Sequence, residues 1–217
     1  MYTNCFIPKT TQQLEKIESL GLKSEWLQDI GRKALAAYNQ TTTHDATTAP
    51  GSYAYFAAVR ALRDILCPEG WQEIVHKNVE MVANPDNGVS IMVSSGNKDT
   101  GKENGKPKTK NQKGNQTKKF VSFNNLQRYL PTMEQEITNI SLSNIWILLF
   151  HVDTKKSELR IELSLPIEMD IDDLRVSKWY QRIIIDSIDF SNTPKKNDLY
   201  VDFAPESTIE LERKSNG

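Results

Sequence analysis

One stretch of the chain restricts the fold more than any other: residues 144–153, NIWILLFHVD. It holds six consecutive apolar residues, 145–150, which indicates a strand buried on both faces at the centre of a sheet. A tight turn at 154–156 and an alternating segment at 157–166 follow. The apolar side of that segment consists of Leu159, Ile161, Leu163 and Leu165. We therefore predict an antiparallel pair whose second strand is covered on one face only.

The first part of the chain has helical periodicity instead. Apolar residues recur every three or four positions in the segments 10–21, 24–38 and 51–67. Gly21 is a helix-stop signal after the first segment, and Pro68 disfavours helix at the end of the third. We predict three helices, with a threonine-rich loop at 39–50 between the second and the third.

After Trp71 the pattern is typical of strands. Residues 73–83 and 88–95 predict a β-hairpin, because turn-forming residues, NPDNG, lie between them. Residues 179–190 and 198–205 are two further strand candidates. The segment 120–140 indicates a short strand with one or two helical turns.

Helices followed by strands place the chain in the α+β class. We predict N-terminal helices packed on a mostly antiparallel β-sheet, with a long lysine-rich loop. The helical region is expected at 1–70 and the β-rich region at 71–217, and the two together are expected to form one compact unit.

Composition bears on location. No run approaches the roughly 18–20 apolar residues that a membrane-spanning helix needs, and the N-terminus lacks a signal-peptide pattern. The two cysteines, Cys5 and Cys67, provide no disulfide framework. We therefore expect a cytoplasmic protein that contacts no membrane.

Positive charge is concentrated in the segment 96–119, which we predict to be a basic loop. From Lys98 to Lys119 there are eight lysines against Asp99 and Glu103, a net charge of 8 − 2 = +6 in a chain of net charge −1. The rest of the chain therefore carries −1 − 6 = −7. The eight lysines are the candidate nucleic-acid-binding residues: Lys98, Lys102, Lys106, Lys108, Lys110, Lys113, Lys118 and Lys119.

Two interpretations of this segment stay open. Lysines on a loop can neutralise the phosphates of DNA or RNA without reading the sequence, but the same composition also fits a solvated, disordered insert. Arginine is absent from the segment, so bidentate base recognition is not supplied by it. Thr100, Thr109, Thr117 and spaced glycines favour a loop with defined turns.

Residues 96–102, GNKDTGK, match half of a phosphate-binding P-loop. Glu103 stands where that motif needs Ser or Thr, and no apolar helix follows, so we exclude it. Asp153-Thr154-Lys155 could belong to a magnesium nuclease but fits a hairpin turn better. His44-Asp45 could be a base with its orienting carboxylate, although an Asx-type turn is the simpler interpretation.

The remaining candidates are weaker. Arg60 and Arg63 could clamp an anion, or could lie on a solvated helix face with Arg60 and Asp64 paired. His44, His76 and His151 have no zinc-ligand spacing. We therefore predict no catalytic residue, no metal site and no cofactor.

Two stretches, Asp45–Leu66 and Val89–Gly114, resemble small uncharacterised bacterial proteins from mobile-element or phage-defence gene neighbourhoods. In those proteins a strand runs into a glycine-containing loop that ends in Thr-Lys-x-x-Lys-Gly, which here is Thr109–Gly114. The resemblance covers about a fifth of the chain; it implies a context and assigns no catalytic residue.

Three hypotheses follow. The first is a non-catalytic accessory subunit of a bacterial defence or mobile-element complex, which contacts other protein subunits and touches DNA or RNA through the lysines. The second is a protein–protein scaffold without nucleic-acid contact. The third is a magnesium-dependent enzyme acting on a nucleotide or nucleic acid through His44, Asp45 or Asp153.

Overall fold

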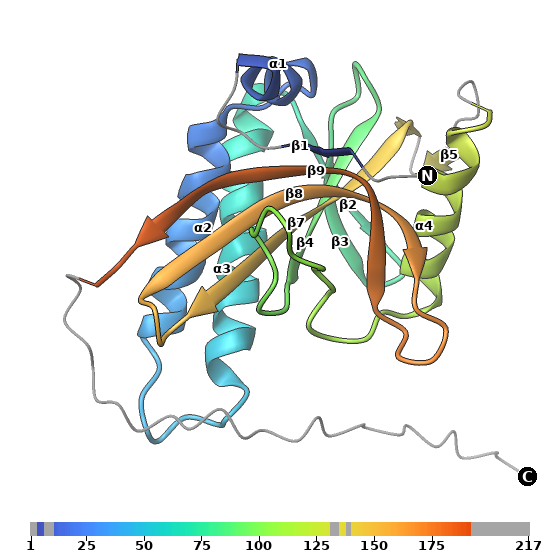
Figure 1. Cartoon of the computed structure of the whole chain (residues 1–217). Helices are drawn as coiled ribbons and strands as arrows, with labels where there is room; N and C mark the ends of the chain where they lie inside the picture. Colours follow the sequence, from blue (N-terminus) through green and yellow to red (C-terminus); the bar gives the residue numbers. More distant parts are fainter. Residues whose placement is uncertain (1–3, 7–10, 131–134, 138–139, 192–217) are drawn as a thin grey trace, which may run out of the picture.

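The computed structural model of the chain describes residues 4–6, 11–130, 135–137 and 140–191 (Figure 1). The α-helices within these ranges are α1 (Thr11–Ser19), α2 (Ser24–Asn39), α3 (Ala49–Leu66) and α4 (Asn115–Gln127). The three helices predicted before Trp71 are confirmed. The helical turns and the short strand predicted within 120–140 are confirmed as the end of α4 and as β5 (Gln135–Ile137), although α4 begins earlier than predicted.

A seven-stranded sheet has the order β1-β9-β8-β7-β4-β3-β2. Its strands are β1 (Asn4–Phe6), β2 (Gln72–His76), β3 (Val79–Ala83), β4 (Val89–Ser95), β7 (Asn144–Asp153), β8 (Glu158–Met169) and β9 (Val176–Asp189). Only β4–β7 and β1–β9 are parallel among the neighbouring pairs. A separate hairpin consists of β5 (Gln135–Ile137) and β6 (Ile140–Leu142). The predicted α+β class, with a mostly antiparallel sheet, is confirmed.

The apolar run at 145–150 forms the middle of β7, which is the central strand of the sheet, as predicted. The prediction for its neighbour is wrong. Strand β8 was expected to be covered on one face only, yet its residues are buried on both faces from 159 to 166. A second layer must therefore cover the face on which the polar residues of β8 lie.

The hairpin predicted at 73–95 contains one more strand than expected. Lys77 and Asn78 have positive φ angles, 48° and 64°, and join β2 to β3 in a tight turn. This two-residue geometry matches the right-handed twist of paired strands. The predicted turn at 84–88 is confirmed between β3 and β4. The strand candidate at 179–190 is confirmed as part of β9, and the one at 198–205 lies outside the described residues.

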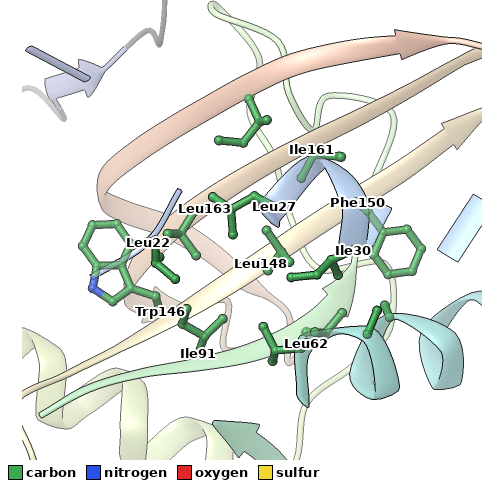
Figure 2. Packing of buried hydrophobic residues seen from close by; sticks show 14 of the residues in the cluster. Leu22, Leu27, Ile30, Leu62, Ile91, Trp146, Leu148, Phe150, Ile161 and Leu163 are labelled. Atoms are coloured by element: carbon green, nitrogen blue, oxygen red, sulfur yellow. The ribbon is translucent and has the colours of Figure 1, made fainter. Parts of the chain in front are cut away.

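Helices α1, α2 and α3 pack on one face of the sheet, which we call the helix face. Its core joins α-helical residues such as Leu27, Ile30 and Leu62 to strand residues such as Leu148 and Leu163 (Figure 2). Helix α2 lies close to β8, because a Cβ built on Gly31 would be 2.2 Å from Cδ1 of Ile161. The helices before Trp71 and the strands after it therefore share one apolar core.

The opposite face of the sheet, which we call the loop face, is covered in two parts. Helix α4 covers an apolar part, where Phe120 and Phe123 pack with Ile147 and Leu149 of β7. The side-chain amide of Asn124 is buried there. It donates to the carbonyls of Ile145 (2.8 Å) and Pro166 (3.1 Å) and accepts from the N–H of Ile145 (3.0 Å). Proline has no N–H to offer the ladder, so Asn124 supplies the missing partner.

The chain between β4 and α4 covers the remaining, polar part of the loop face, in front of β7, β8 and β9 in Figure 1. In the portion of the chain that the structure describes, no helix is both long and apolar enough to cross a membrane.

Candidate nucleic-acid interface

The basic loop spans residues 96–114, which is shorter than predicted because Lys118 and Lys119 belong to α4. It begins by extending the sheet: the N–H of Gly96 donates to the carbonyl of Phe150 (2.8 Å). It then turns back, and Gly96 and Thr109 form an antiparallel bridge. The N–H of Lys110 donates to the carbonyl of Ser95 (2.8 Å). The loop thus leaves the sheet and returns to its own starting point.

Three charged side chains lie buried between this loop and the sheet. Arg160 and Glu162 belong to β8 and Arg182 to β9, with exposed fractions of 4%, 0% and 3%. Glu162 accepts from Arg182 at 2.5 and 3.3 Å and from the hydroxyl of Ser164 at 3.0 Å. Arg160 pairs with Asp153 and Glu158 near the rim of the sheet. We call Arg160, Glu162 and Arg182 the buried charge cluster.

The two arginines hold the loop by its backbone. Arg160 donates to the carbonyls of residues 98 (3.0 Å) and 100 (2.9 Å), and Arg182 to those of 102 (3.0 Å) and 105 (3.2 Å). Guanidinium groups present several donors in a rigid fork, so two side chains can hold four carbonyls. Because the loop turns these carbonyls inward, its main chain is fixed from residue 98 to residue 105.

Two glycines make the close approach possible. Gly101 has φ +70°, and a Cβ there would lie 2.7 Å from the Cβ of Arg160. A Cβ on Gly96 would lie 2.0 Å from the hydroxyl oxygen of Thr100, which is fully buried. The prediction that glycines and threonines mark defined turns is confirmed at Gly96, Thr100 and Gly101, whereas Thr117 lies in helix α4.

The second half of the loop is held by β9. The indole N–H of Trp179 donates to the carbonyl of Pro107 (2.8 Å). Buried Thr109 donates its N–H to the carbonyl of Val176 (3.1 Å), and its hydroxyl accepts from the N–H of Val176 (3.2 Å). With both halves anchored, the alternative interpretation of the segment as a disordered insert is wrong.

The structure also agrees with the exclusion of a P-loop. No helix begins directly after Lys102, because the next helix in the described chain, α4, begins only at Asn115. The N–H of Gly101 donates to the carboxylate of Glu162 (2.8 Å). A donor that a P-loop would direct at phosphate is thus occupied by an acid of the protein.

The loop divides its lysines into two groups. The first group, Lys98, Lys106 and Lys110, is exposed. The two lysines of α4, Lys118 and Lys119, are exposed as well. We call these five the exposed lysines. Because the loop backbone is fixed by its inward carbonyls, the exposed lysines of the loop extend from a defined frame.

The second group is engaged with the protein. Lys102 lies 3.6 Å from the carboxylate of Asp99, and Lys108 binds Asp170 (3.0 Å) and Asp173 (3.3 Å). These hydrogen bonds raise the pKa of Lys108 and tie the loop to the β8–β9 turn. Lys113 is partly buried, and burial lowers its pKa to about 8. Of the eight predicted lysines, five are therefore exposed and three are paired or partly buried.

The loop and α4 form one continuous basic stretch. Residues 104–133 contain no Asp or Glu, six lysines and Arg128. Two acidic residues beside the loop, Asp170 and Asp173, are bonded to Lys108. The chain as a whole has a net charge close to zero, but these 30 residues carry only positive side-chain charges. Their local positive charge attracts a polyanion.

The candidate catalytic residues are held in structural roles. Asp45 accepts from the N–H (2.7 Å) and hydroxyl of Thr42, and its pKa is lowered by the backbone hydrogen bond in particular. The simpler interpretation as a turn is thus supported. Asp153 closes the β7–β8 turn and pairs with Arg160, as the hairpin interpretation predicts. Burial acts to raise its pKa, but the hydrogen bonds from Lys156 and Arg160 outweigh it and leave the pKa lowered.

His151 is next to Asp153 but serves the loop. Its Nδ1 lies 3.2 Å from the carbonyl of Gly96, and burial lowers its pKa. The pair expected between Arg60 and Asp64 does not form. Arg63 instead binds Glu73 and Glu80 of strands β2 and β3. Arg60 and Arg63 are therefore not brought together as an anion clamp.

Within the described ranges, no group of three or more His, Cys, Asp and Glu side chains is placed to hold a metal ion. Comparison of the chain with protein-family models, curated proteins and solved structures finds no match. The interface must therefore be interpreted from its own residues.

Proposed function

We propose that this protein is a non-catalytic accessory subunit that binds the phosphate backbone of DNA or RNA through the exposed lysines. The observation that supports this most is the division of the loop into two sides. On the inner side, the arginines of the buried charge cluster donate hydrogen bonds to the backbone carbonyls of the loop. On the outer side, the side chains of Lys98, Lys106 and Lys110 are exposed. A fixed loop loses little conformational freedom on binding, which favours affinity.

The ligand we propose is a polyanion with evenly spaced charges. Lysines contribute as point charges and release counterions from the phosphates, so the affinity depends on charge number and little on base sequence. We place the subunit in a bacterial defence or mobile-element complex. This context rests on the resemblance of residues 45–66 and 89–114.

The decisive experiment measures affinity against salt. A triple variant, Lys98→Ala, Lys106→Ala and Lys110→Ala, is compared with the parent by fluorescence anisotropy on a labelled oligonucleotide. We expect the dissociation constant to rise at least about 10-fold at 100 mM salt, and the salt slope to fall by about 2 to 3.

A matched control carries the same loss of charge on the helix face: Lys16→Ala, Lys23→Ala and Lys33→Ala in and beside α1 and α2. It should change the affinity less than about twofold, because its charges lie outside the interface. If both triple variants weaken binding equally, only net charge matters and the loop is not the site. If the parent does not bind nucleic acid at all, the proposal fails.

One observation favours the competing proposal of a protein–protein scaffold. Strand β2 lies at an end of the sheet, and Val75 on it is 57% exposed. An edge strand with an exposed apolar residue is a template for strand addition by a partner. The scaffold would co-elute with a partner in size-exclusion chromatography while the loop variants bind that partner normally.

A further inference from the structure

A pair of exposed tyrosines lies at the end of α4 opposite the basic loop. Tyr129 follows the last turn of α4 and is 71% exposed; Tyr180 comes from β9 and is 46% exposed. The guanidinium of Arg128 lies 5.6 Å from the ring centroid of Tyr129 and 4.6 Å from that of Tyr180. We call Tyr129, Tyr180 and Arg128 the tyrosine platform.

The platform does not serve the core. Leu126 (48%) and Leu130 (57%) are exposed beside Tyr129. Together with the two tyrosines they gather four large apolar side chains near one end of a helix. A cluster of this kind on the surface marks a contact site more often than a single exposed residue does.

Tyr129 of the platform and two of the exposed lysines, Lys118 and Lys119, follow one helical course. Leu130 donates its N–H to the carbonyl of Leu126 (3.0 Å), so the helical course continues past the end of α4. Lys118 and Tyr129 are 11 residues apart, which at 100° per residue places them only about 20° apart around the helix axis. At 1.5 Å per residue they are separated by about 16 Å along it.

Charge along this stripe is uniformly positive or neutral. Ser122 and Asn125 lie between Lys118 and Tyr129, and no carboxylate occurs from residue 104 to residue 133. A ligand that follows the stripe therefore meets lysines at one end and stacked tyrosine and arginine at the other. An apolar protein partner would make no use of the lysines, and a duplex would make no use of the rings.

We infer that the nucleic acid is single-stranded, with its phosphates on Lys118 and Lys119 and its bases stacked on the tyrosine platform. The inference rests on the proposed function and specifies its ligand. Stacking needs a base with a free face, which a single strand offers and a duplex keeps inside its own stack. Base–aromatic stacking tolerates any base, so the binding should stay independent of sequence.

The test compares two labelled ligands, a 15-nucleotide oligothymidylate and a 15-base-pair duplex, by fluorescence anisotropy. The variant is Tyr129→Leu with Tyr180→Leu, which keeps apolar bulk and removes the aromatic faces. We expect a loss of about 10- to 100-fold in affinity for the single strand and less than about twofold for the duplex. The salt slope should stay that of the parent, because no lysine is changed.

The matched control is Tyr53→Leu, an exposed tyrosine on α3 at the helix face, which should bind both ligands as the parent does. Circular dichroism and the unfolding midpoint verify that the double variant is folded; if it is not, Tyr129→Leu alone, at the more exposed position, is used.

The outcomes separate the two proposals. If the parent binds both ligands equally and the double variant is unchanged, the single-strand inference is overturned while the proposed function stands. If the parent binds neither ligand, the proposed function itself fails. If the double variant keeps its single-strand affinity but loses a protein partner that the parent retains, the platform is a protein contact and the inference is again overturned.

Discussion

Adjacent residues of β8 are buried by opposite means. Leu163 lies on the helix face, among the apolar side chains of the core shown in Figure 2, and Glu162 lies on the loop face against Arg182. Both are 0% exposed. The helix face is buried by apolar area, while this part of the loop face is buried by charges that use the loop backbone as partners. A lysine-rich segment can therefore cover the sheet, because it buries its backbone carbonyls and not its lysine side chains.

The two faces differ in what each layer specifies. Apolar packing tolerates exchange of one aliphatic residue for another of similar volume. The buried charge cluster requires each donor and acceptor in place, since an unpaired buried charge is costly. The loop conformation therefore depends on three residues far away in sequence, and the exposed lysines depend on that conformation.

The largest expected effect comes from breaking the cluster. Glu162→Leu leaves Arg182 buried without its carboxylate partner, and we expect the free energy of unfolding to fall by about 3–5 kcal/mol. Urea unfolding measures this. Limited trypsin digestion under native conditions should show faster cleavage after Lys110, since the loop opens first.

Ser164→Ala is the matched control for Glu162→Leu. It removes the single hydrogen bond from Ser164 to the carboxylate and should cost about 1 kcal/mol. A loss no larger than this in Glu162→Leu would show that the arginines find other partners and that the cluster does not hold the loop.

Leu163→Ala tests the other face. Removing three buried carbons from the core of the helix face should lower the free energy of unfolding by about 2–4 kcal/mol. Because the change is on the helix face, tryptic cleavage of the loop should rise only as much as global unfolding requires. Selective cleavage after Lys110 in this variant would mean that the two faces are not independent.

The difference between the faces also explains what the sequence could predict. The central strand β7, the three N-terminal helices and the strand β9 follow from apolar runs and periodicity, which reflect burial directly. The short turn at Lys77-Asn78 was missed because it contains neither glycine nor proline. Helix α4 was predicted only as one or two helical turns, because Asn124 and Gln127 are polar and yet buried.

The candidate site was predictable only in part. The charge of the loop and its need for turns are evident from its lysines, threonines and glycines. Its anchors, Arg160 and Arg182, belong to strands in which a charged residue normally indicates a solvent-exposed face. Nothing local to residues 157–166 reveals that a segment 60 residues earlier covers that face. The engagement of Lys108 depends on Asp170 and Asp173, which are equally remote.

A smaller effect of opposite sign is expected at Lys113. Burial lowers its pKa to about 8, whereas an unfolded lysine titrates near 10.4. The folded state therefore holds the proton less tightly, so the cost of burying the charge is complete below about pH 8 and disappears above about pH 10.4. Lys113→Met should stabilise the protein by about 1 kcal/mol at pH 7, less than full linkage implies because the side chain keeps some solvent contact.

Urea unfolding of the parent and of Lys113→Met at pH 7 and pH 9.5 checks both sign and cause. The advantage of the variant should shrink at the higher pH, as the parent loses its buried charge. An advantage that is equal at both values would assign the gain to apolar packing of methionine and would remove the electrostatic argument.

The smallest effect on stability, and the sharpest contrast with the buried cluster, is expected at Lys106. Its side chain is exposed, while its carbonyl accepts from the side chain of Asn97 (3.2 Å). Lys106→Ala keeps that carbonyl, so the free energy of unfolding should stay within about 0.5 kcal/mol of the parent. Nucleic-acid affinity should nevertheless fall severalfold, because one point charge on the phosphates is lost. Lys108→Ala is the counterpart: its ion pairs with Asp170 and Asp173 are lost, so stability should fall more than in Lys106→Ala and affinity less. The two variants are measured side by side in urea unfolding and anisotropy. If Lys108→Ala lost more affinity than Lys106→Ala, the ligand would contact Lys108 and not the exposed Lys106.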